Sequence, residues 1–408
     1  MSKKNVFLVS LIIVGILLLV VSTLLIVNDM FWSDAFVVLG YISLISGLSN
    51  IINYFKSRNK AYLIRFVLNI VGGLILIFYT RIPVRLLFIV FSAYIVGNGL
   101  IQFISYMLIA KGKVKVGFLV FLAVLIVILF GVSLFLGKVV TTRIFNIVLG
   151  IYGILLGITH IADGIYGLIP REKKDKMKRR IKVSPPNFVT AFIPLFVLEY
   201  INNKLSPSES KNQISYDKCV EVFIHVSKKG FGAIGHVDFS IGDKVYSYGN
   251  HDQESAKFLG AIGDGVLFIA NKKDYVLYCI EDDNNAIFSY EVLLNNEQYD
   301  IVNENIEELM STSYRWKPNL KDSSEGNYAK IIFDATNAEF YKFSSGKFKN
   351  YFVLGENCVK LVDGIIGSSS GSGAFNMNGI ISPGAYQLYL EGEYQKGNTN
   401  IVSRVMYK

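Results

Sequence analysis

The sequence predicts a multi-domain protein in which an all-α six-helix transmembrane bundle precedes a small α+β domain. Over half of the 408 residues are hydrophobic and only 18% are charged, which is unusual for a soluble protein. Six long apolar segments fill the first 170 residues, and each is near the length of about 20 residues that spans a bilayer. From residue 216 onward, short segments of alternating polarity take their place, as is typical of strands.

We place the six spans near residues 5–27, 33–55, 61–80, 83–110, 116–137 and 141–168. The first is too long, and too closely followed by others, to be a cleaved signal peptide. The N-terminus, the loops at 56–60 and 111–115, and a basic run at 171–182 carry most Lys and Arg, and all fall on one side. Because positive residues accumulate on the cytoplasmic side, we expect both termini in the cytoplasm.

The charge of the chain excludes some classes of partner. Residues 1–186 hold 21 Lys and Arg against 5 Asp and Glu, whereas residues 187–408 hold 20 against 27. The basic excess therefore flanks apolar segments, which indicates membrane topology rather than nucleic-acid binding. The cysteines, Cys219, Cys279 and Cys358, lie far apart without paired spacing. We therefore expect no disulfide framework, no metal site and no cofactor, and a reducing compartment.

The six spans look like three copies of one hairpin. Gly-x-x-x-Ile recurs in the even spans, at Gly47, Gly97 and Gly157, and such small residues allow helices to approach closely in lipid. Over roughly residues 5–168 this pattern resembles the HdeD-like membrane proteins, a bacterial family linked to acid resistance. The resemblance implies a multi-pass protein of the bacterial inner membrane, whose helices could also join copies into a homo-oligomer.

Ionisable residues inside the spans are few. Arg65, His160 and Asp163 lie near the expected cytoplasmic ends, where long or polar side chains can reach water. No broken helix or acidic relay accompanies them, so packing and anchoring is favoured over a transport pathway. A transporter with a regulatory tail is therefore the weakest of the alternatives.

The segment after the last span joins the two halves. Its basic run at 171–182 is typical of a stop-transfer flank and would also contact anionic headgroups. Residues 187–201 are apolar but short for a span, so we interpret them as an amphipathic helix lying on the membrane or on the bundle. A polar linker follows at 202–215. The predicted domains are a six-span transmembrane domain at 1–170, this joint at 171–215, and an α+β domain at 216–408.

The second half alternates between strand and helix patterns. We expect strands at 219–226, 236–241 and 244–248, a hairpin from 266–270 and 275–280, a helix at 296–312, and further strands at 330–333, 339–343 and 401–407. Within 236–241, the residues Val237, Phe239 and Ile241 point one way, while His236, Asp238 and Ser240 point the other.

An amphipathic helix is predicted to begin at Cys358. Apolar residues recur with helical spacing from Val359 to Ile366, and Asn357 is suited to the N-cap. In the first turn, unpaired backbone N–H groups and the helix dipole favour a thiolate. The ordinary alternative is a small buried hydrophobe, which is what we assume for Cys219 and Cys279.

Two short motifs carry a second resemblance. Gly-His-Val-Asp-Phe-Ser-Ile-Gly at 235–242, followed far downstream by Glu-Asn-Cys-Val-Lys-Leu-Val at 356–362, resembles the permuted papain-like cysteine hydrolases. That group includes lecithin-retinol acyltransferase relatives and bacterial peptidase or amidase relatives. The resemblance spans about 216–408 and implies a papain-like α+β fold.

The resemblance also implies roles for particular residues. Cys358 would be the nucleophile that attacks a carbonyl carbon, and His236 would take the thiol proton. The backbone amide of Cys358 could stabilise the oxyanion. A third polar residue on the next strand often orients the imidazole, and here His251, Asn250 and Ser247 are available, with His251 preferred.

Together these features predict a membrane-anchored cytoplasmic cysteine hydrolase, of peptidase or amidase type, or an acyltransferase. Its substrate would be an amide or ester carbonyl, and membrane lipids would be its neighbours. The alternative is a non-catalytic stress-response or sensor protein whose papain-like domain only binds a partner. That alternative predicts that Cys358→Ala leaves function intact.

Overall fold

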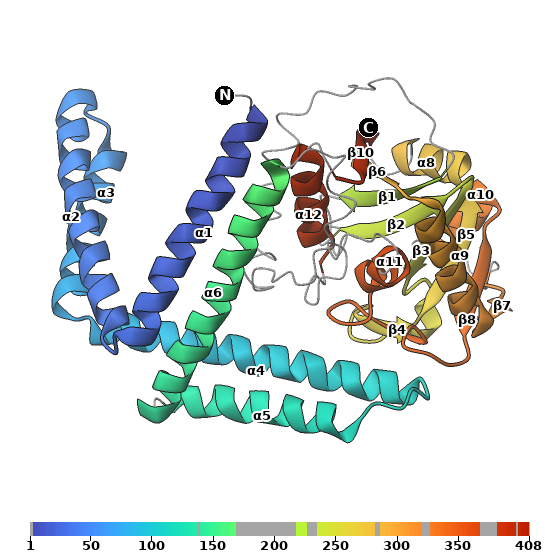
Figure 1. Ribbon diagram of the computed structural model, residues 1–408, viewed down its shortest axis with the longest axis horizontal. Coiled ribbons are helices and arrows are strands. Elements are labelled where there is room, and N and C mark those ends of the chain that lie inside the picture. Colours follow the sequence, from blue (N-terminus) through green and yellow to red (C-terminus); the bar gives the residue numbers. More distant parts are fainter. Residues whose placement is uncertain are drawn as a thin grey trace. The chain divides into compact units, whose positions relative to one another are not determined.

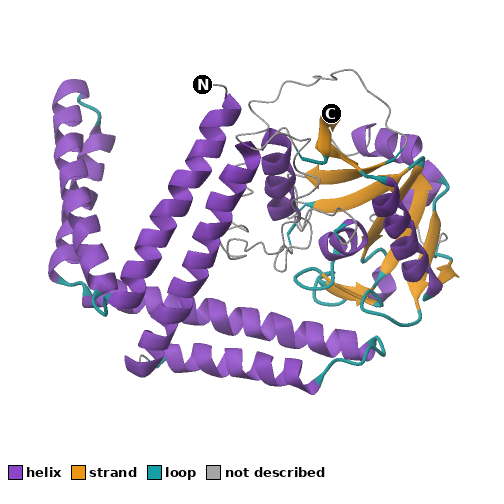
Figure 2. Ribbon diagram, viewed as in Figure 1, coloured by secondary structure: helices purple, strands orange, loops and turns teal. Residues whose placement is uncertain are grey.

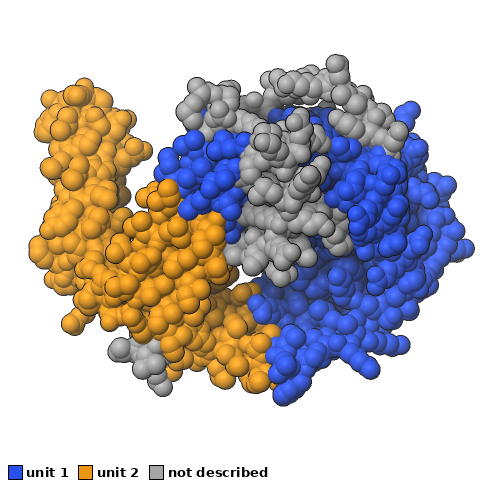
Figure 3. Space-filling view, in the orientation of Figure 1, with its two compact units in different colours: residues 1–13, 101–120, 159–408 blue, residues 14–100, 121–158 orange. Residues whose placement is uncertain are grey.

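A computed structural model describes residues 3–136, 139–168, 218–226, 235–281, 286–319, 327–367, 382–396 and 399–407. The chain divides into two compact units (Figure 3): residues 1–13, 101–120 and 159–408 form one, and residues 14–100 and 121–158 form the other. The predicted domain limits at 170 and 215 stay a prediction. The predicted joint helix at 187–201 lies outside the described residues.

Six apolar helices occupy the N-terminal region (Figure 1): α1 (Lys3–Val27), α2 (Phe31–Ser57), α3 (Lys60–Phe78), α4 (Arg81–Lys111), α5 (Phe118–Phe135) and α6 (Val139–Leu168). All six contain segments long and apolar enough to cross a membrane. Many of their large apolar side chains are exposed on the isolated chain, as expected for a surface that meets lipid. The six predicted spans are confirmed, and the protein is a multi-pass membrane protein.

Glycines mark the close approaches between these helices. A Cβ on Gly73 of α3 would lie 2.9 Å from the carbonyl oxygen of Gly40 on α2, and one on Gly131 of α5 would lie 2.8 Å from Val96 on α4. A Cβ on Gly157 of α6 would likewise lie 2.8 Å from the backbone of α1. Each of these contacts joins helices that belong to different predicted hairpins. The small residues thus permit close packing between one hairpin and the next.

The C-terminal part is built on an eight-stranded antiparallel sheet with the order β10-β6-β1-β2-β3-β5-β8-β7, and β4 and β9 form a separate pair. Figure 2 shows the strands of this part in orange and its helices in purple. Its strands are β1 (Cys219–Val226), β2 (His236–Ile241), β3 (Lys244–Gly249), β4 (Ile262–Asp264), β5 (Val266–Asn271), β6 (Ala286–Leu293), β7 (Ser313–Trp316), β8 (Glu339–Phe343), β9 (Asn350–Phe352) and β10 (Ile401–Tyr407). The register of β1 and β2 places His225 directly opposite His236.

Helices cover both faces of this sheet. They are η3 (Gln253–Ser255), α8 (Lys272–Glu281), α9 (Asn296–Ser311), α10 (Tyr328–Thr336), α11 (Cys358–Ile366) and α12 (Pro383–Lys396). One core joins Val222 and Phe239 of the sheet to Leu361 of α11, together with α9 and α12. A second core joins Phe223 of the sheet to Tyr275 of α8, together with α10. Consecutive residues of β1 thus enter opposite cores, as strand alternation requires.

Several local predictions are confirmed and two are wrong. The strands predicted at 219–226, 236–241, 244–248, 266–270, 339–343 and 401–407 and the helices starting at residues 296 and 358 all occur. Residues 275–280, however, lie in α8, and residues 330–333 lie in α10. Tyr275 and Cys279, four residues apart, are both buried, which is the spacing of one helical face. The strand β6, which lies between β10 and β1, and the helix α12 were not predicted.

Candidate active site

Cys358 is the first residue of α11, and Asn357 caps the helix. The Asn357 side-chain oxygen accepts a hydrogen bond from the Lys360 backbone N–H at 3.2 Å, and its Nδ2 donates to the Val353 carbonyl at 2.8 Å. Cys358 itself is only 3% exposed. The cap fixes the start of the helix at the sulfur, where the dipole favours an anion.

His236 begins β2, and its ring contacts three side chains. Its Nε2 lies 2.7 Å from Oδ1 of Asp238 and 3.0 Å from the Ser247 hydroxyl. The Cys358 side chain is near enough to act on the His236 ring, and it contributes to the raised pKa of His236. The structure thus brings together Cys358 and His236, the two residues paired from the motifs.

Asp238 is fully buried beside this pair. While Oδ1 faces His236, Oδ2 accepts a hydrogen bond from the Tyr275 hydroxyl at 2.6 Å and lies 2.8 Å from Nε2 of His225. A buried carboxylate keeps its charge only where donors and cations replace water. Asp238 has such neighbours on both oxygens.

The charged groups of the cluster shift one another's pKa values. Burial lowers the pKa of His236, but the Asp238 carboxylate and the Cys358 thiolate outweigh burial and raise that pKa well above its ordinary value. Burial raises the pKa of Asp238, but the charge of His236 and hydrogen bonds from His225 and His236 bring it well below its ordinary value. An imidazolium and a carboxylate are therefore favoured side by side at neutral pH, and a neighbouring cation stabilises a thiolate.

The three residues that the sequence offered for orienting the His236 imidazole differ in what they contact. The ring centre of His251 is 6.3 Å from that of His236, and the His251 ring stacks on Tyr328 at 5.2 Å. Burial, assisted by the charge of His236, lowers the pKa of His251 to about 3. Ser247 does touch His236, whereas Asn250 donates to a backbone carbonyl in a downstream turn at 3.1 Å.

Sequence reasoning missed three members of the cluster. Asp238 lies two residues from His236 on the same strand, so the alternation of β2 already placed both side chains on one face. No local motif surrounds His225 in the sequence. Tyr275 was not predicted as a member of the cluster because its segment, which is rich in aromatic and β-branched residues, resembles a strand.

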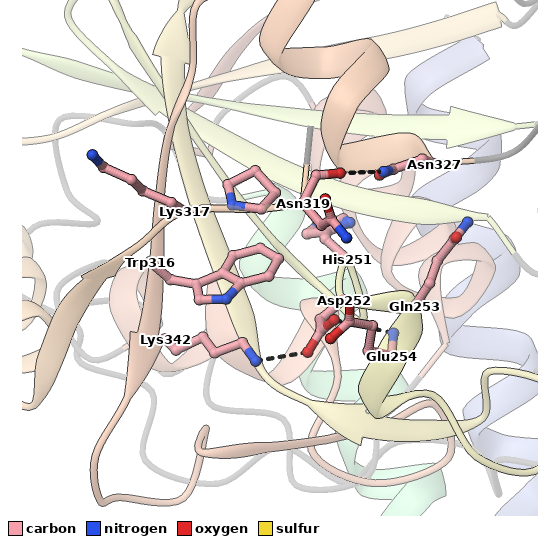
Figure 4. Close-up of a pocket in the computed structure, with 10 residues that line it drawn as sticks. His251, Asp252, Gln253, Glu254, Trp316, Lys317, Asn319, Asn327 and Lys342 are labelled. Atoms are coloured by element: carbon pink, nitrogen blue, oxygen red, sulfur yellow. Dashed lines mark hydrogen bonds and ion pairs between the residues drawn. The ribbon is translucent and has the colours of Figure 1, made fainter. Parts of the chain in front are cut away.

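A polar pocket of about 170 Å³ has His251 in its wall (Figure 4). The lining residues are His251, Asp252, Gln253, Glu254, Trp316, Lys317, Pro318, Asn319, Asn327 and Lys342. The Lys342 ammonium lies 2.6 Å from Asp252 and 4.7 Å from the centre of the Trp316 ring. Cys358 and His236 do not line this pocket. Within the described ranges, no three His, Cys, Asp or Glu residues form a group that could hold a metal ion.

Comparison with known proteins identifies only part of the membrane region. Residues 13–78 match a family described as a short repeat of unknown function, DUF308, to which HdeD belongs. The match extends from within α1 to the end of α3. No curated protein and no solved structure matches the chain.

Proposed function

We propose that the C-terminal domain is a cysteine hydrolase or acyltransferase that the six apolar helices hold at the membrane. One observation supports this most: the Cys358 side chain lies near enough to His236 to raise its pKa, and Nε2 of His236 lies 2.7 Å from the buried Asp238 carboxylate. A nucleophile, a base and an orienting carboxylate in that order are the parts that thiol catalysis needs. The two sequence motifs support the same roles.

The proposed chemistry is acyl transfer through a thioester. His236 takes the proton of Cys358, and the sulfur forms a bond to the carbonyl carbon of an amide or ester while an electron pair moves to oxygen. The backbone amide of Cys358 is the group we expect at this oxyanion. Collapse breaks the bond to the leaving amine or alcohol, which receives the proton from His236. Water, or another nucleophile, then releases the acyl group and returns the proton to Cys358.

The orienting role is proposed for Asp238 rather than His251. Asp238 lies against Nε2 of His236, whereas the His251 ring is 6.3 Å away, centre to centre. A carboxylate also stabilises the imidazolium that forms during the reaction, which a neutral imidazole does much less. Ser247, at 3.0 Å from the same nitrogen, would assist in holding the ring.

The proposed location is the inner membrane of a bacterium, with both termini in the cytoplasm. The basic loops on one side of the spans support this orientation. Tethering to the bilayer would raise the effective concentration of a membrane-bound substrate, which makes a lipid ester or amide reasonable.

The test is the alkylation rate of each cysteine by iodoacetamide against pH, followed by mass spectrometry of full-length protein in detergent. Cys219 is an internal reference because it is more exposed than Cys358, while burial and the charges of Glu291 and Glu221 raise its pKa. We expect Cys358 to react faster than Cys219 at pH 6.

His236→Ala should slow the alkylation of Cys358 at pH 6 by about tenfold or more, because the Cys358 thiolate loses the neighbouring His236 cation. His160→Ala removes a histidine of α6 and should leave the rate unchanged. A Cys358 rate with an ordinary thiol pKa, indifferent to His236→Ala, would refute the enzyme and favour a partner-binding domain.

A further inference from the structure

The two carboxylate oxygens of Asp238 contact different side chains. Oδ1 lies 2.7 Å from Nε2 of His236, while Oδ2 accepts a hydrogen bond from Tyr275 and lies 2.8 Å from Nε2 of His225. We infer that His225 and Tyr275 are positioning residues, which hold Oδ2 of Asp238 and so keep Oδ1 on Nε2 of His236. The inference rests on the proposed thiol chemistry and adds two residues to it.

The geometry supports a positioning role because bulk solvent does not reach the carboxylate. Asp238 is 0% exposed, Tyr275 is 1% exposed and His225 is 8% exposed. The terminal torsion of an aspartate is broad, so packing alone does not fix the direction of its oxygens. The Tyr275 hydroxyl donates a hydrogen bond to Oδ2 at 2.6 Å, and Nε2 of His225 lies 2.8 Å from the same oxygen, so both groups restrict that direction.

These two groups come from different elements. His225 lies on β1 directly opposite His236, and Tyr275 lies on α8, which packs on the same face of the sheet. The His225 ring is also 5.8 Å from the Tyr275 ring, centre to centre. The cluster therefore joins the first strand of the sheet, the histidine strand and α8 through one carboxylate.

Tyr275 is a donor at every pH of interest. Burial, followed by the charge of Asp238, raises the pKa of Tyr275 well above its ordinary value, so its hydroxyl keeps its proton. The titratable groups that face this carboxylate or its partners are His225, His236, His251, Tyr275, Cys279, Tyr328 and Cys358. A neutral His225 donates to Oδ2 only in the tautomer that carries its proton on Nε2.

The test compares Tyr275→Phe, His225→Leu and His225→Gln in full-length protein, using the pH profile of Cys358 alkylation by iodoacetamide. Tyr275→Phe and His225→Leu should each slow the alkylation of Cys358 at pH 6 about tenfold relative to the wild type. The reason is that a freed carboxylate stabilises the His236 cation less. His225→Gln keeps an N–H donor and should stay within about threefold of the wild type.

Tyr278→Phe removes a hydroxyl from the same helix α8 and should leave the profile unchanged. If Tyr275→Phe and His225→Leu only lower the melting temperature and leave the profile in place, the positioning role is overturned while the proposed function stands. If alkylation of Cys358 is as slow in His225→Gln as in His225→Leu, the positioning role is also overturned. His225 would then act through protonation of its imidazole and not through an N–H donor. An inert thiol in the wild type overturns both proposals. Tyr275→Phe is nearly isosteric, so it decides the question alone if His225→Leu does not fold.

Discussion

Two neighbouring histidines, one on β2 and one after β3, have pKa values shifted in opposite directions. The Asp238 carboxylate, 2.7 Å from His236, outweighs the burial of that ring and raises its pKa. His251 stacks on Tyr328 and is farther from the carboxylate, so burial dominates and lowers its pKa to about 3. The difference arises because burial penalises a cation that lacks a close counter-charge.

His251 should therefore make the domain sensitive to acid. Its folded pKa is below the unfolded value of about 6.5, so its contribution to stability is complete above pH 6.5 and is lost as pH falls toward 3. At pH 4.5 the loss relative to neutral pH is at most about 2–3 kcal/mol. His251→Phe keeps the stacking on Tyr328 and should lose correspondingly less stability between pH 7 and pH 4.5.

The measurement is denaturant unfolding of the full-length protein at both pH values, followed by tryptophan fluorescence. His160→Phe serves as the control and should retain the acid sensitivity of the wild type. If the wild type and His251→Phe lose the same free energy of unfolding between pH 7 and pH 4.5, His251 does not take up a proton on unfolding.

At the scale of single elements, adjacent glycines of one helix differ in what they do. A Cβ on Gly73 of α3 would lie 2.8 Å from the Leu44 side chain and 2.9 Å from the Gly40 carbonyl oxygen, whereas a Cβ on Gly72 would meet nothing within 4 Å. Gly73 therefore permits the close approach of α2 and α3, and Gly72 does not limit it. Backbone contact of this kind is a main source of helix association in lipid.

Gly73→Ala should destabilise the membrane region by about 1–3 kcal/mol, because the methyl group would overlap the backbone of α2. Gly72→Ala is the matched control and should be neutral or slightly stabilising, since alanine favours helix over glycine by about 1 kcal/mol. Thermal unfolding in detergent measures both. Equal effects of the two substitutions would contradict a packing role for Gly73.

At the scale of the whole molecule, the orientation in the membrane decides which compartment supplies the substrate. The basic loops predict that the loop between α1 and α2 faces outward and the loop between α4 and α5 faces the cytoplasm. Since six spans lie among the described residues before the C-terminal sheet, the predicted topology places the domain on the side of the N-terminus.

Single cysteines introduced at Asn28 and Lys113 should report this orientation. In intact cells, a membrane-impermeant maleimide should label Asn28→Cys and leave Lys113→Cys unlabelled, and both should react once the cells are permeabilised. Labelling confined to Lys113→Cys would reverse the topology and place the C-terminal domain outside.

The sequence by itself determined the features that depend on local pattern. Apolar length defines a span whatever its neighbours are, so all six helices were found. The start of α11 at Cys358 follows from a capping asparagine and helical spacing. The alternation of β2 likewise placed His236 and Asp238 on one face.

Only the tertiary structure decided which polar groups meet. Tyr275 is 37 residues from Asp238 along the chain, and its hydroxyl reaches Oδ2 because α8 packs on the face of the sheet that carries the carboxylate. His225 lies opposite His236 through the pairing register of β1 and β2. Packing and register are long-range properties that periodicity within one segment does not contain. For the same reason His251, on the chain segment after β3, was preferred from sequence, while the contact at Nε2 of His236 is made by Asp238.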